Sequence, residues 1–207
     1  MDKSIRFWDR AAEKYARSTI KNMPVYERKL GWTREHLTPD STVLEYGSGT
    51  GSTALLHAEH VRHIVALDSS SAMTAIALEK AAKQGVDNVE FLTGTILDTI
   101  LPDASFDAVL ALNVLHLIPQ WEASIARSYA LLKPGGVFIS GSALIKEIGL
   151  HLRLLIPIAR LFGKAPEVVA FTKSELLRAL TDVGFEIALN ESPGSKVGVF
   201  IVARKPA

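Results

Sequence analysis

Short apolar runs bounded by turn residues alternate with helical patterns from residue 42 onward. This alternation is typical of βαβ units around a parallel sheet, because a strand covered on both faces reads as an apolar run. The predicted strands lie near 42–46, 63–68, 89–93, 106–112, 136–141, 185–190 and 197–204. The predicted helices between them lie near 52–61, 70–84, 121–132 and 173–183. We therefore expect an α/β fold with a doubly wound, mostly parallel sheet of seven strands.

Several turn signals fix the boundaries of these elements. The run 133–136, Lys-Pro-Gly-Gly, is expected to end a helix and turn the chain into the next strand. Thr172 and Glu175 have the spacing of a capping box that opens the last helix, and Gly184 is expected to close it. A Pro-Gly turn at 193–194 separates the last two strands, which predicts an antiparallel hairpin at the sheet edge.

Two helices are predicted before the first strand. Ile5, Trp8, Ala12 and Tyr15 recur at helical spacing, and a second helical stretch runs from Pro24 to about residue 37. We expect residues 1–207 to form one domain. Within it, 1–40 would be an N-terminal helical cap, 41–207 a sheet core, and 143–170 an insertion in that core.

Composition narrows the class of protein. Hydrophobic residues make up 48% of the chain and charged residues 22%, as in ordinary globular proteins. There is no cysteine, which excludes disulfides, zinc–thiolate sites and a cysteine nucleophile. The first residues are charged and lack the apolar core of a signal peptide, so we expect a cytoplasmic protein. The net charge of +1 gives no electrostatic reason to expect a nucleic-acid ligand.

The first predicted strand ends in the sequence VLEYGSGTG, residues 43–51, with glycine at every second position of its last part. Glycine allows a sharp turn and brings backbone N–H groups close to a ligand. A dinucleotide site requires G-x-G-x-x-G, and here the third glycine, Gly51, comes one residue early. Glu45 suits an ammonium group better than a pyrophosphate. A tight turn without a ligand is the alternative.

The second predicted strand, HIVALD, ends in Asp68. A carboxylate at this position can accept hydrogen bonds from both hydroxyls of a ribose. It can also act as the N-cap of the helix that begins near Ser69. Both interpretations remain open at this point.

The sequence contains four motifs in the order in which they occur in one known family: VLEYGSGTG, IVALDSSSAM, SFDAVLALNVLHLI and LLKPGGVFIS. The chain resembles the class I S-adenosylmethionine-dependent methyltransferases of the small-molecule type, over about residues 42–204. The resemblance implies a Rossmann-like fold, S-adenosyl-L-methionine as cofactor and S-adenosyl-L-homocysteine as product. It also implies methyl transfer by in-line displacement to a small acceptor.

The resemblance assigns roles to individual residues. Gly47, Ser48 and Gly49 would lie under the methionine portion of the cofactor, Glu45 would shape that loop, and Asn113 would face the methionine end and the acceptor. The predicted contacts to ribose and adenine are Asp68, Ser69, Met73, Thr95 and Ile96. Many family members have aspartate where this chain has Thr95, which puts the contact to the adenine amino group in doubt and makes Asp98 a candidate replacement.

Two further side chains have competing interpretations. Tyr15 resembles a cap tyrosine that closes over the cofactor, or it simply packs with Trp8 in an amphipathic helix. His116, just beyond the fourth strand, is the candidate general base, or it is a hydrogen-bonded structural residue in the turn. Alignment alone can lower the barrier by roughly 7–11 kcal/mol, so a base is not obligatory. We predict no metal site, because the histidines show no ligand spacing.

The insertion contains an apolar stretch, residues 148–166, with Arg153 and Arg160 inside it. We interpret it as a helix broken near Pro157 that forms a lid over the acceptor together with the N-terminal helices. A lipophilic acceptor, with or without an anionic group and reached partly at a membrane surface, would fit these basic and apolar segments. The alternative is packing on the core or in a homodimer, and both monomer and homodimer remain open.

Three other functions compete with a small-molecule methyltransferase. A NAD(P)-dependent oxidoreductase is opposed by the glycine spacing, and a non-catalytic cofactor-binding module by the intact Gly47, Gly49 and Asp68. A nucleic-acid methyltransferase lacks its expected N-P-P-Y/F motif here.

Overall fold

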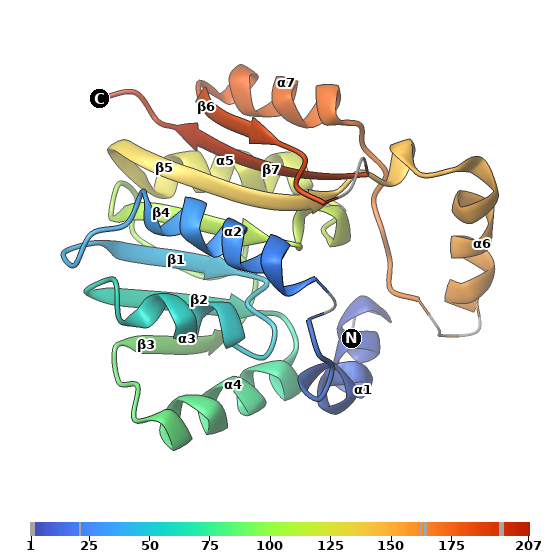
Figure 1. Ribbon diagram of the computed structural model, residues 1–207, viewed down its shortest axis with the longest axis horizontal. Coiled ribbons are helices and arrows are strands. Elements are labelled where there is room, and N and C mark those ends of the chain that lie inside the picture. The colour runs from blue at the N-terminus through green and yellow to red at the C-terminus, as the bar shows by residue number, and fades with distance from the viewer. Residues whose placement is uncertain (1–2, 21, 162, 164, 195–196) are drawn as a thin grey trace.

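The computed structural model of the chain describes residues 3–20, 22–161, 163, 165–194 and 197–207. Its strands are β1 Thr42–Tyr46, β2 His63–Asp68, β3 Val89–Thr93, β4 Phe106–Leu112, β5 Leu132–Ala143, β6 Glu186–Glu191 and β7 Gly198–Arg204. Its helices are α1 Lys3–Ala16, α2 Met23–Arg34, α3 Ser52–Ala58, α4 Ser71–Gln84, α5 Trp121–Leu131, α6 Leu150–Leu161 and α7 Lys173–Val183. The strands form one sheet with helices on both faces (Figure 1).

The strand order is β3-β2-β1-β4-β5-β7-β6. β1 to β5 pair in parallel, and β7 lies antiparallel between β5 and β6. The predicted doubly wound sheet and its antiparallel edge hairpin are confirmed. Because the chain runs from β1 to one side and returns to β4 on the other, the carboxyl ends of β1 and β4 meet at the point where ligands bind in such sheets.

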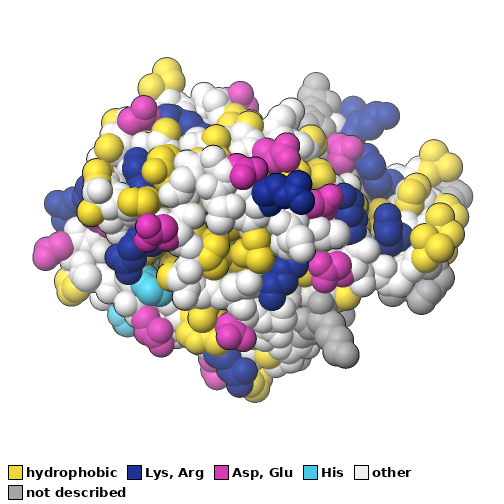
Figure 2. Space-filling view, turned by 90° about the horizontal axis from the view of Figure 1, so that it is seen from above, with side chains coloured by type: hydrophobic (Ala, Val, Ile, Leu, Met, Phe, Trp, Pro, Cys, Tyr) yellow, Lys and Arg dark blue, Asp and Glu magenta, His cyan; other side chains and the backbone are white. Residues whose placement is uncertain are grey.

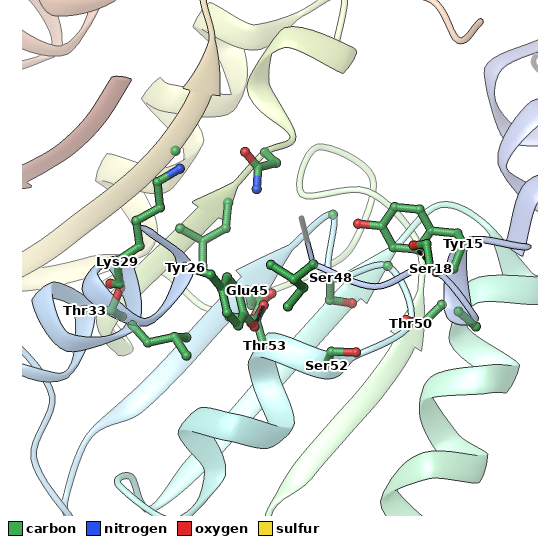
Figure 3. Close-up of a pocket in the computed structure, with 18 of the residues that line it drawn as sticks. Tyr15, Ser18, Tyr26, Lys29, Thr33, Glu45, Ser48, Thr50, Ser52 and Thr53 are labelled. Atoms are coloured by element: carbon green, nitrogen blue, oxygen red, sulfur yellow. Dashed lines mark hydrogen bonds between the residues drawn. The ribbon is translucent and has the colours of Figure 1, made fainter. Parts of the chain in front are cut away.

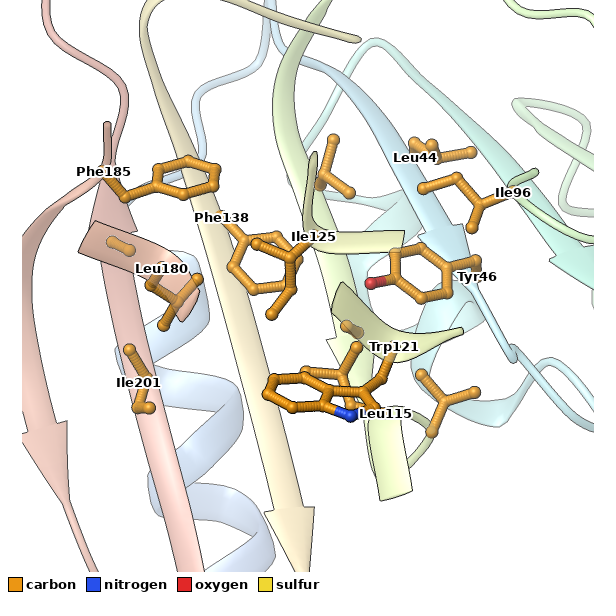
Figure 4. Close-up of a cluster of buried hydrophobic side chains, with 14 of the residues drawn as sticks. Leu44, Tyr46, Ile96, Leu115, Trp121, Ile125, Phe138, Leu180, Phe185 and Ile201 are labelled. Atoms are coloured by element: carbon orange, nitrogen blue, oxygen red, sulfur yellow. The ribbon is translucent and has the colours of Figure 1, made fainter. Parts of the chain in front are cut away.

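Each face of the sheet has its own core. On β1, Leu44 and Tyr46 point into the cluster beneath α5 and α7, whereas Val43 points into the cluster beneath α3 and α4. Figure 4 shows the first of these clusters, where Tyr46 and Trp121 lie beside Leu115. Alternate residues of one strand therefore serve opposite cores, which explains the continuous apolar run.

The prediction for residues 133–136 is wrong. Helix α5 already ends at Leu131, and the Lys-Pro-Gly-Gly run lies inside β5. The pairing of β5 with β4 shifts register here, and the Gly135 N–H donates to the Lys205 carbonyl at 3.0 Å. The run is thus a bulge that joins the chain's C-terminal segment, because its glycines adapt to an irregular ladder.

The predicted break near Pro157 is also absent. Pro157 lies inside a continuous α6. A proline removes one N–H donor, which would have served the carbonyl of Arg153, and Arg153 is exposed. An exposed carbonyl can be solvated, so the helix continues through the proline. Residues 162 and 164 of the predicted lid lie outside the described residues.

Candidate functional site

Three adjoining cavities form a groove along the carboxyl ends of β1, β2 and β4, and Gly47 lines all of them. The α2-side cavity, of about 310 Å³, is lined by residues of α2 and by Glu45. The central cavity, of about 130 Å³, is lined by Asp68 and Met73. The β3-side cavity, of about 460 Å³, is lined by the residues that follow β3, beginning at Gly94.

All three glycines of the loop have left-handed backbone conformations, and two of them also lack space for a side chain. Gly47, Gly49 and Gly51 have φ angles of +67°, +56° and +75°. A Cβ on Gly47 would lie 2.2 Å from Val114 Cγ2, and a Cβ on Gly51 would lie 2.8 Å from Ala77 Cβ, so these two positions also lack space. A Cβ on Gly49 would meet only Tyr15, at 3.7 Å. Gly49 therefore lies on the open side of the loop, facing the groove.

Asp68 fastens the loop to the next strand end. Its Oδ2 accepts a hydrogen bond from the Gly49 N–H at 2.8 Å, and its Oδ1 accepts one from the Ser70 N–H at 2.8 Å. The N-cap of α4 is Ser70, whose hydroxyl accepts from the Met73 N–H, so the N-cap interpretation of Asp68 is wrong. Burial raises the pKa of Asp68. Each carboxylate oxygen can accept a second hydrogen bond, as a ribose would require.

Glu45 carries an unsatisfied carboxyl oxygen at the groove. Its side chain is buried, and its Oε2 has no hydrogen-bond partner among the described residues. Burial, and to a lesser degree the nearby Asp68, raises the pKa of Glu45 to about 8. Figure 3 shows Glu45 at the floor of the α2-side cavity. A buried carboxyl without a partner is suited to a cationic ligand.

These features fit S-adenosylmethionine. The orphaned Glu45 oxygen matches an ammonium group, the open surface at Gly49 leaves room for the methionine portion, and Asp68 has free acceptor capacity for hydroxyls. Glu45, Gly47, Ser48 and Gly49 all line the α2-side cavity. The structure thus brings the predicted methionine-end residues together.

Asn113 joins two of the cavities in a strained conformation. Its φ is +59°, which is unusual for any residue except glycine, and asparagine tolerates it better than most. Its N–H donates to the Gly141 carbonyl at 2.7 Å, which ties the end of β4 to β5. Asn113 lines both the α2-side and the central cavity, as expected for a residue facing the methionine end and the acceptor.

Tyr15 of α1 covers the glycine loop and packs with Trp8 at the same time. It lines the α2-side and central cavities, and its ring stands perpendicular to that of Trp8 with the centroids 6.1 Å apart. The Ser70 hydroxyl donates to Asp9 Oδ1 at 2.7 Å, which fixes α1 to the start of α4. The packing of Tyr15 with Trp8 is thus observed, while its closing over the cofactor stays a prediction.

The predicted adenine residues line the β3-side end of the groove. Thr95 and Ile96 line the β3-side cavity, and Ser69 lines both this cavity and the central one. Asp98 lies beside Thr95, whose hydroxyl donates to Asp98 Oδ2 at 2.8 Å. A carboxylate is thus present at this edge even though the family's usual aspartate is not.

His116 does not lie with these residues. It belongs to a 3₁₀ turn, Leu115–Leu117, and lines none of the three cavities. The Ala143 N–H approaches its Nδ1 at 3.4 Å, and burial lowers its pKa to about 4. The turn directs the imidazole toward the end of β5, so the geometry supports the structural interpretation. Its role as a base stays a prediction.

Lys29 is a site residue that was not predicted from the sequence. This residue of α2 lines the α2-side cavity, and burial lowers its pKa. Its ammonium group has no hydrogen-bond or ion-pair partner among the described residues. Figure 3 shows its amino group extending away from Glu45. A lysine on an amphipathic helix has no sequence signal that separates it from a surface lysine.

No group of three or more histidine, cysteine or acidic side chains among the described residues could hold a metal ion. In the same residues, no helix is both long enough and apolar enough to cross a membrane.

Known proteins match about half of the chain, including the glycine loop and the ends of β2 and β4. A family model for a methyltransferase domain matches residues 43–136. The chain is 31% identical over 114 residues to the ubiquinone/menaquinone biosynthesis C-methyltransferase UbiE of Brucella anthropi, covering 53% of this chain and 43% of that protein. It is 34% identical over 103 residues to the arsenite methyltransferase of Halobacterium salinarum, covering 48% of this chain and 26% of that protein. Each match spans less than half of the relative.

Among solved structures, the cyclase SpnF aligns with a TM-score of 0.74 at 21% identity, covering 87% of this chain and 81% of that chain. At this identity the likeness shows the fold alone. The family match decides between the interpretations that the glycine spacing left open, and the sheet order and the loop geometry agree with it. Residues 43–136 thus match a methyltransferase domain, and the chain has the Rossmann-like fold of the class I S-adenosylmethionine-dependent methyltransferases.

Proposed function

We propose that the chain is an enzyme that transfers a methyl group from S-adenosylmethionine to a small acceptor with an apolar body and an anionic group. The observation that carries the acceptor class is Lys29, a half-buried ammonium group without a partner among the described residues, in the α2-side cavity beyond the glycine loop. A cation removed from water favours an anionic ligand.

The surroundings of Lys29 support an apolar acceptor body. Leu30, Leu112 and Phe200 line the same cavity. Phe200 packs against Trp32 with the ring centroids 5.4 Å apart, which makes this wall rigid. These apolar residues from α2, β4 and β7 share the cavity with the Lys29 ammonium group.

The matched relatives leave the acceptor open. One is named for ubiquinone/menaquinone biosynthesis and the other for arsenite, and both match much the same share of this chain. Arsenic binds thiolates, and the 207 residues contain no cysteine. An organic acid or phenol therefore suits this chain better than arsenite.

The mechanism we propose depends mainly on alignment. When bound, S-adenosylmethionine would supply a methyl group activated by its sulfonium, and S-adenosylhomocysteine would be the leaving group as the acceptor atom bonds to that methyl carbon. The glycine loop and Asp68 would fix one partner, while Asn113 and Lys29 would orient the other. Such positioning can lower the barrier by roughly 7–11 kcal/mol. Lys29 would also keep an acidic acceptor ionised, which reduces the need for a separate base.

The test compares Lys29→Met with the parent chain. Cofactor affinity is measured by calorimetry, and methyl transfer by release of S-adenosylhomocysteine over a panel of lipophilic carboxylic acids, phenols and matched neutral analogues. We expect the variant to keep its cofactor affinity and to lose roughly tenfold or more in kcat/KM for the acidic acceptors alone, in line with the loss of one charged contact.

Two outcomes would contradict the proposal. A loss of cofactor affinity in Lys29→Met would assign the ammonium group to the carboxylate of the cofactor instead of the acceptor. Cofactor binding without turnover of any panel member in the parent chain would favour a binding module, or a reaction of another kind on the same fold.

A further inference from the structure

Helix α6 presents large apolar side chains to the solvent. Leu150, Leu154, Leu155, Ile158 and Leu161 are each between 55% and 83% exposed. Four of them, Leu150, Leu154, Ile158 and Leu161, are spaced by four, four and three residues, so they share one face of the helix. In Figure 1, α6 stands at the side of the molecule, away from the sheet. A contiguous exposed apolar face of this kind marks an interaction surface.

Basic side chains border this apolar face. Arg153 and Arg160 lie seven residues apart on α6, which places both on one flank of it. Figure 2 shows hydrophobic side chains gathered at this end of the molecule, with Lys and Arg side chains next to them. The helix therefore combines an exposed apolar stripe with a basic edge, the pattern of helices that lie in the plane of a membrane surface.

Helix α1 extends the basic edge. A cleft of about 740 Å³ between α1 and α6 is lined by four basic residues, Lys3, Arg6, Arg10 and Arg160. Glu167 is the acidic residue among the described lining, and its Oε1 accepts a hydrogen bond from Arg160 at 2.8 Å. Most of this positive charge is not neutralised within the cleft.

We propose that α6 and the basic side of α1 form a surface that docks peripherally on anionic membranes. The apolar stripe would enter the boundary between headgroups and acyl chains, and the basic residues would face anionic headgroups. The charge favours this occupant over a second copy of the chain, because an antiparallel two-fold contact through the stripe would bring the basic edges of both copies to the same side.

The position of the docking surface connects it with the groove. Ser4 lines the α1–α6 cleft and also the central and β3-side cavities. Docking would therefore bring the α1 side of the groove to the membrane. A lipophilic acceptor could then reach the groove from the membrane, a consequence that rests on the proposed function, whereas the docking itself does not.

Because the sequence contains no cysteine, one introduced cysteine can be labelled selectively, which allows a direct test of the docking surface. Leu154→Cys accepts a single environment-sensitive dye on the apolar stripe, and Leu78→Cys, on the exposed side of α4, serves as the matched control. Both labelled proteins are mixed with vesicles of phosphatidylcholine alone and of phosphatidylcholine with phosphatidylserine. We expect a blue-shifted emission for the dye at 154 with the anionic vesicles only, and no shift for the dye at 78.

A second measurement separates the apolar stripe from the charge. In vesicle flotation, Ile158→Glu and Arg6→Glu should each weaken binding to anionic vesicles by about tenfold or more. Equal binding to both vesicle types, or none to either, would overturn the proposal. A dye shift at 154 that grows with protein concentration without vesicles would overturn it in favour of self-association. Calorimetric titration with S-adenosylmethionine tests the proposed function separately, since no variant here alters a residue of the cofactor site.

Discussion

Two carboxyl groups at the ends of neighbouring strands lie in very different environments. Asp68, at the end of β2, accepts backbone hydrogen bonds from Gly49 and Ser70. Glu45, near the end of β1, is buried with an orphaned oxygen and a pKa raised to about 8. The first is satisfied within the chain and stabilises the loop. The second costs free energy in the absence of a ligand, which is typical of a group kept for binding.

The largest expected effect tests this contrast at Glu45. Because its folded pKa lies above the ordinary value of 4.5, its contribution to stability is complete below that value and is lost as the pH rises through about 8. Between these limits the loss should be on the order of 4 kcal/mol. Glu45→Gln should remove it, so denaturant unfolding from pH 5 to pH 9 should show a flatter profile for the variant than for the parent chain.

The same substitution should weaken cofactor binding and change its proton balance. Near pH 7 a largely protonated Glu45 must lose a proton to pair with an ammonium group, so binding should release a proton. Calorimetry in buffers of different ionisation enthalpy measures this release. An unchanged proton release in Glu45→Gln would contradict the ligand role of Glu45, while Asp68→Asn should weaken binding without removing the release.

A second prediction compares Gly47 of the glycine loop with Gly85, the C-cap of α4. Gly47 and Gly85 have almost equal φ angles, +67° and +66°, but a Cβ would clash with Val114 at Gly47 and meet nothing within 4 Å at Gly85. Gly85→Ala should cost only the backbone strain, about 1 kcal/mol. Gly47→Ala adds overpacking and should cost about 3 kcal/mol in the free energy of unfolding. Equal losses in denaturant unfolding would show that Val114 can move away without cost.

The smallest effect concerns His116 beyond β4. Burial lowers the pKa values of both His116 and His57 to about 4, so their contributions to stability are present above pH 6.5 and are lost on acidification toward pH 4. Substitution of either by glutamine should reduce that acid sensitivity by about 2 kcal/mol.

Turnover then separates a base from a structural residue. His57 lies in α3 and lines none of the three cavities of the groove, so His57→Gln is the matched control. With His116 outside the groove, we expect both variants to keep kcat within about threefold, whereas loss of a general base costs roughly 10²–10⁴-fold. A loss of that size in His116→Gln alone would restore His116 as the base.

Local patterns predicted the cofactor half of the fold well. The strands at 42–46, 63–68, 89–93 and 106–112 have the predicted bounds, because each contains buried apolar residues and ends in a turn signal. The fifth strand was predicted to begin at 136, but β5 begins at Leu132. Helix-ending residues read from the chain alone do not reveal that the C-terminal segment pairs with that run.

The acceptor end depends on contacts that the chain makes over long distances. Glu45 could be placed from its distance to the glycines, whereas Lys29 reaches the same cavity only because α2 packs across β1 and β7. Likewise, the apolar stripe of α6 was expected to cover the acceptor, but none of its described residues lines the groove. Periodicity shows that a face is apolar and leaves open what it faces.

The position of β7 has a consequence for the order of assembly. Phe200 forms one wall of the α2-side cavity and packs on Trp32, near the other end of the chain. During synthesis, α2 and the glycine loop emerge long before β7 can enter the sheet between β5 and β6. Contacts so distant in sequence form slowly. A nascent chain therefore carries every residue that would bind the cofactor while the pocket for the acceptor still lacks one wall.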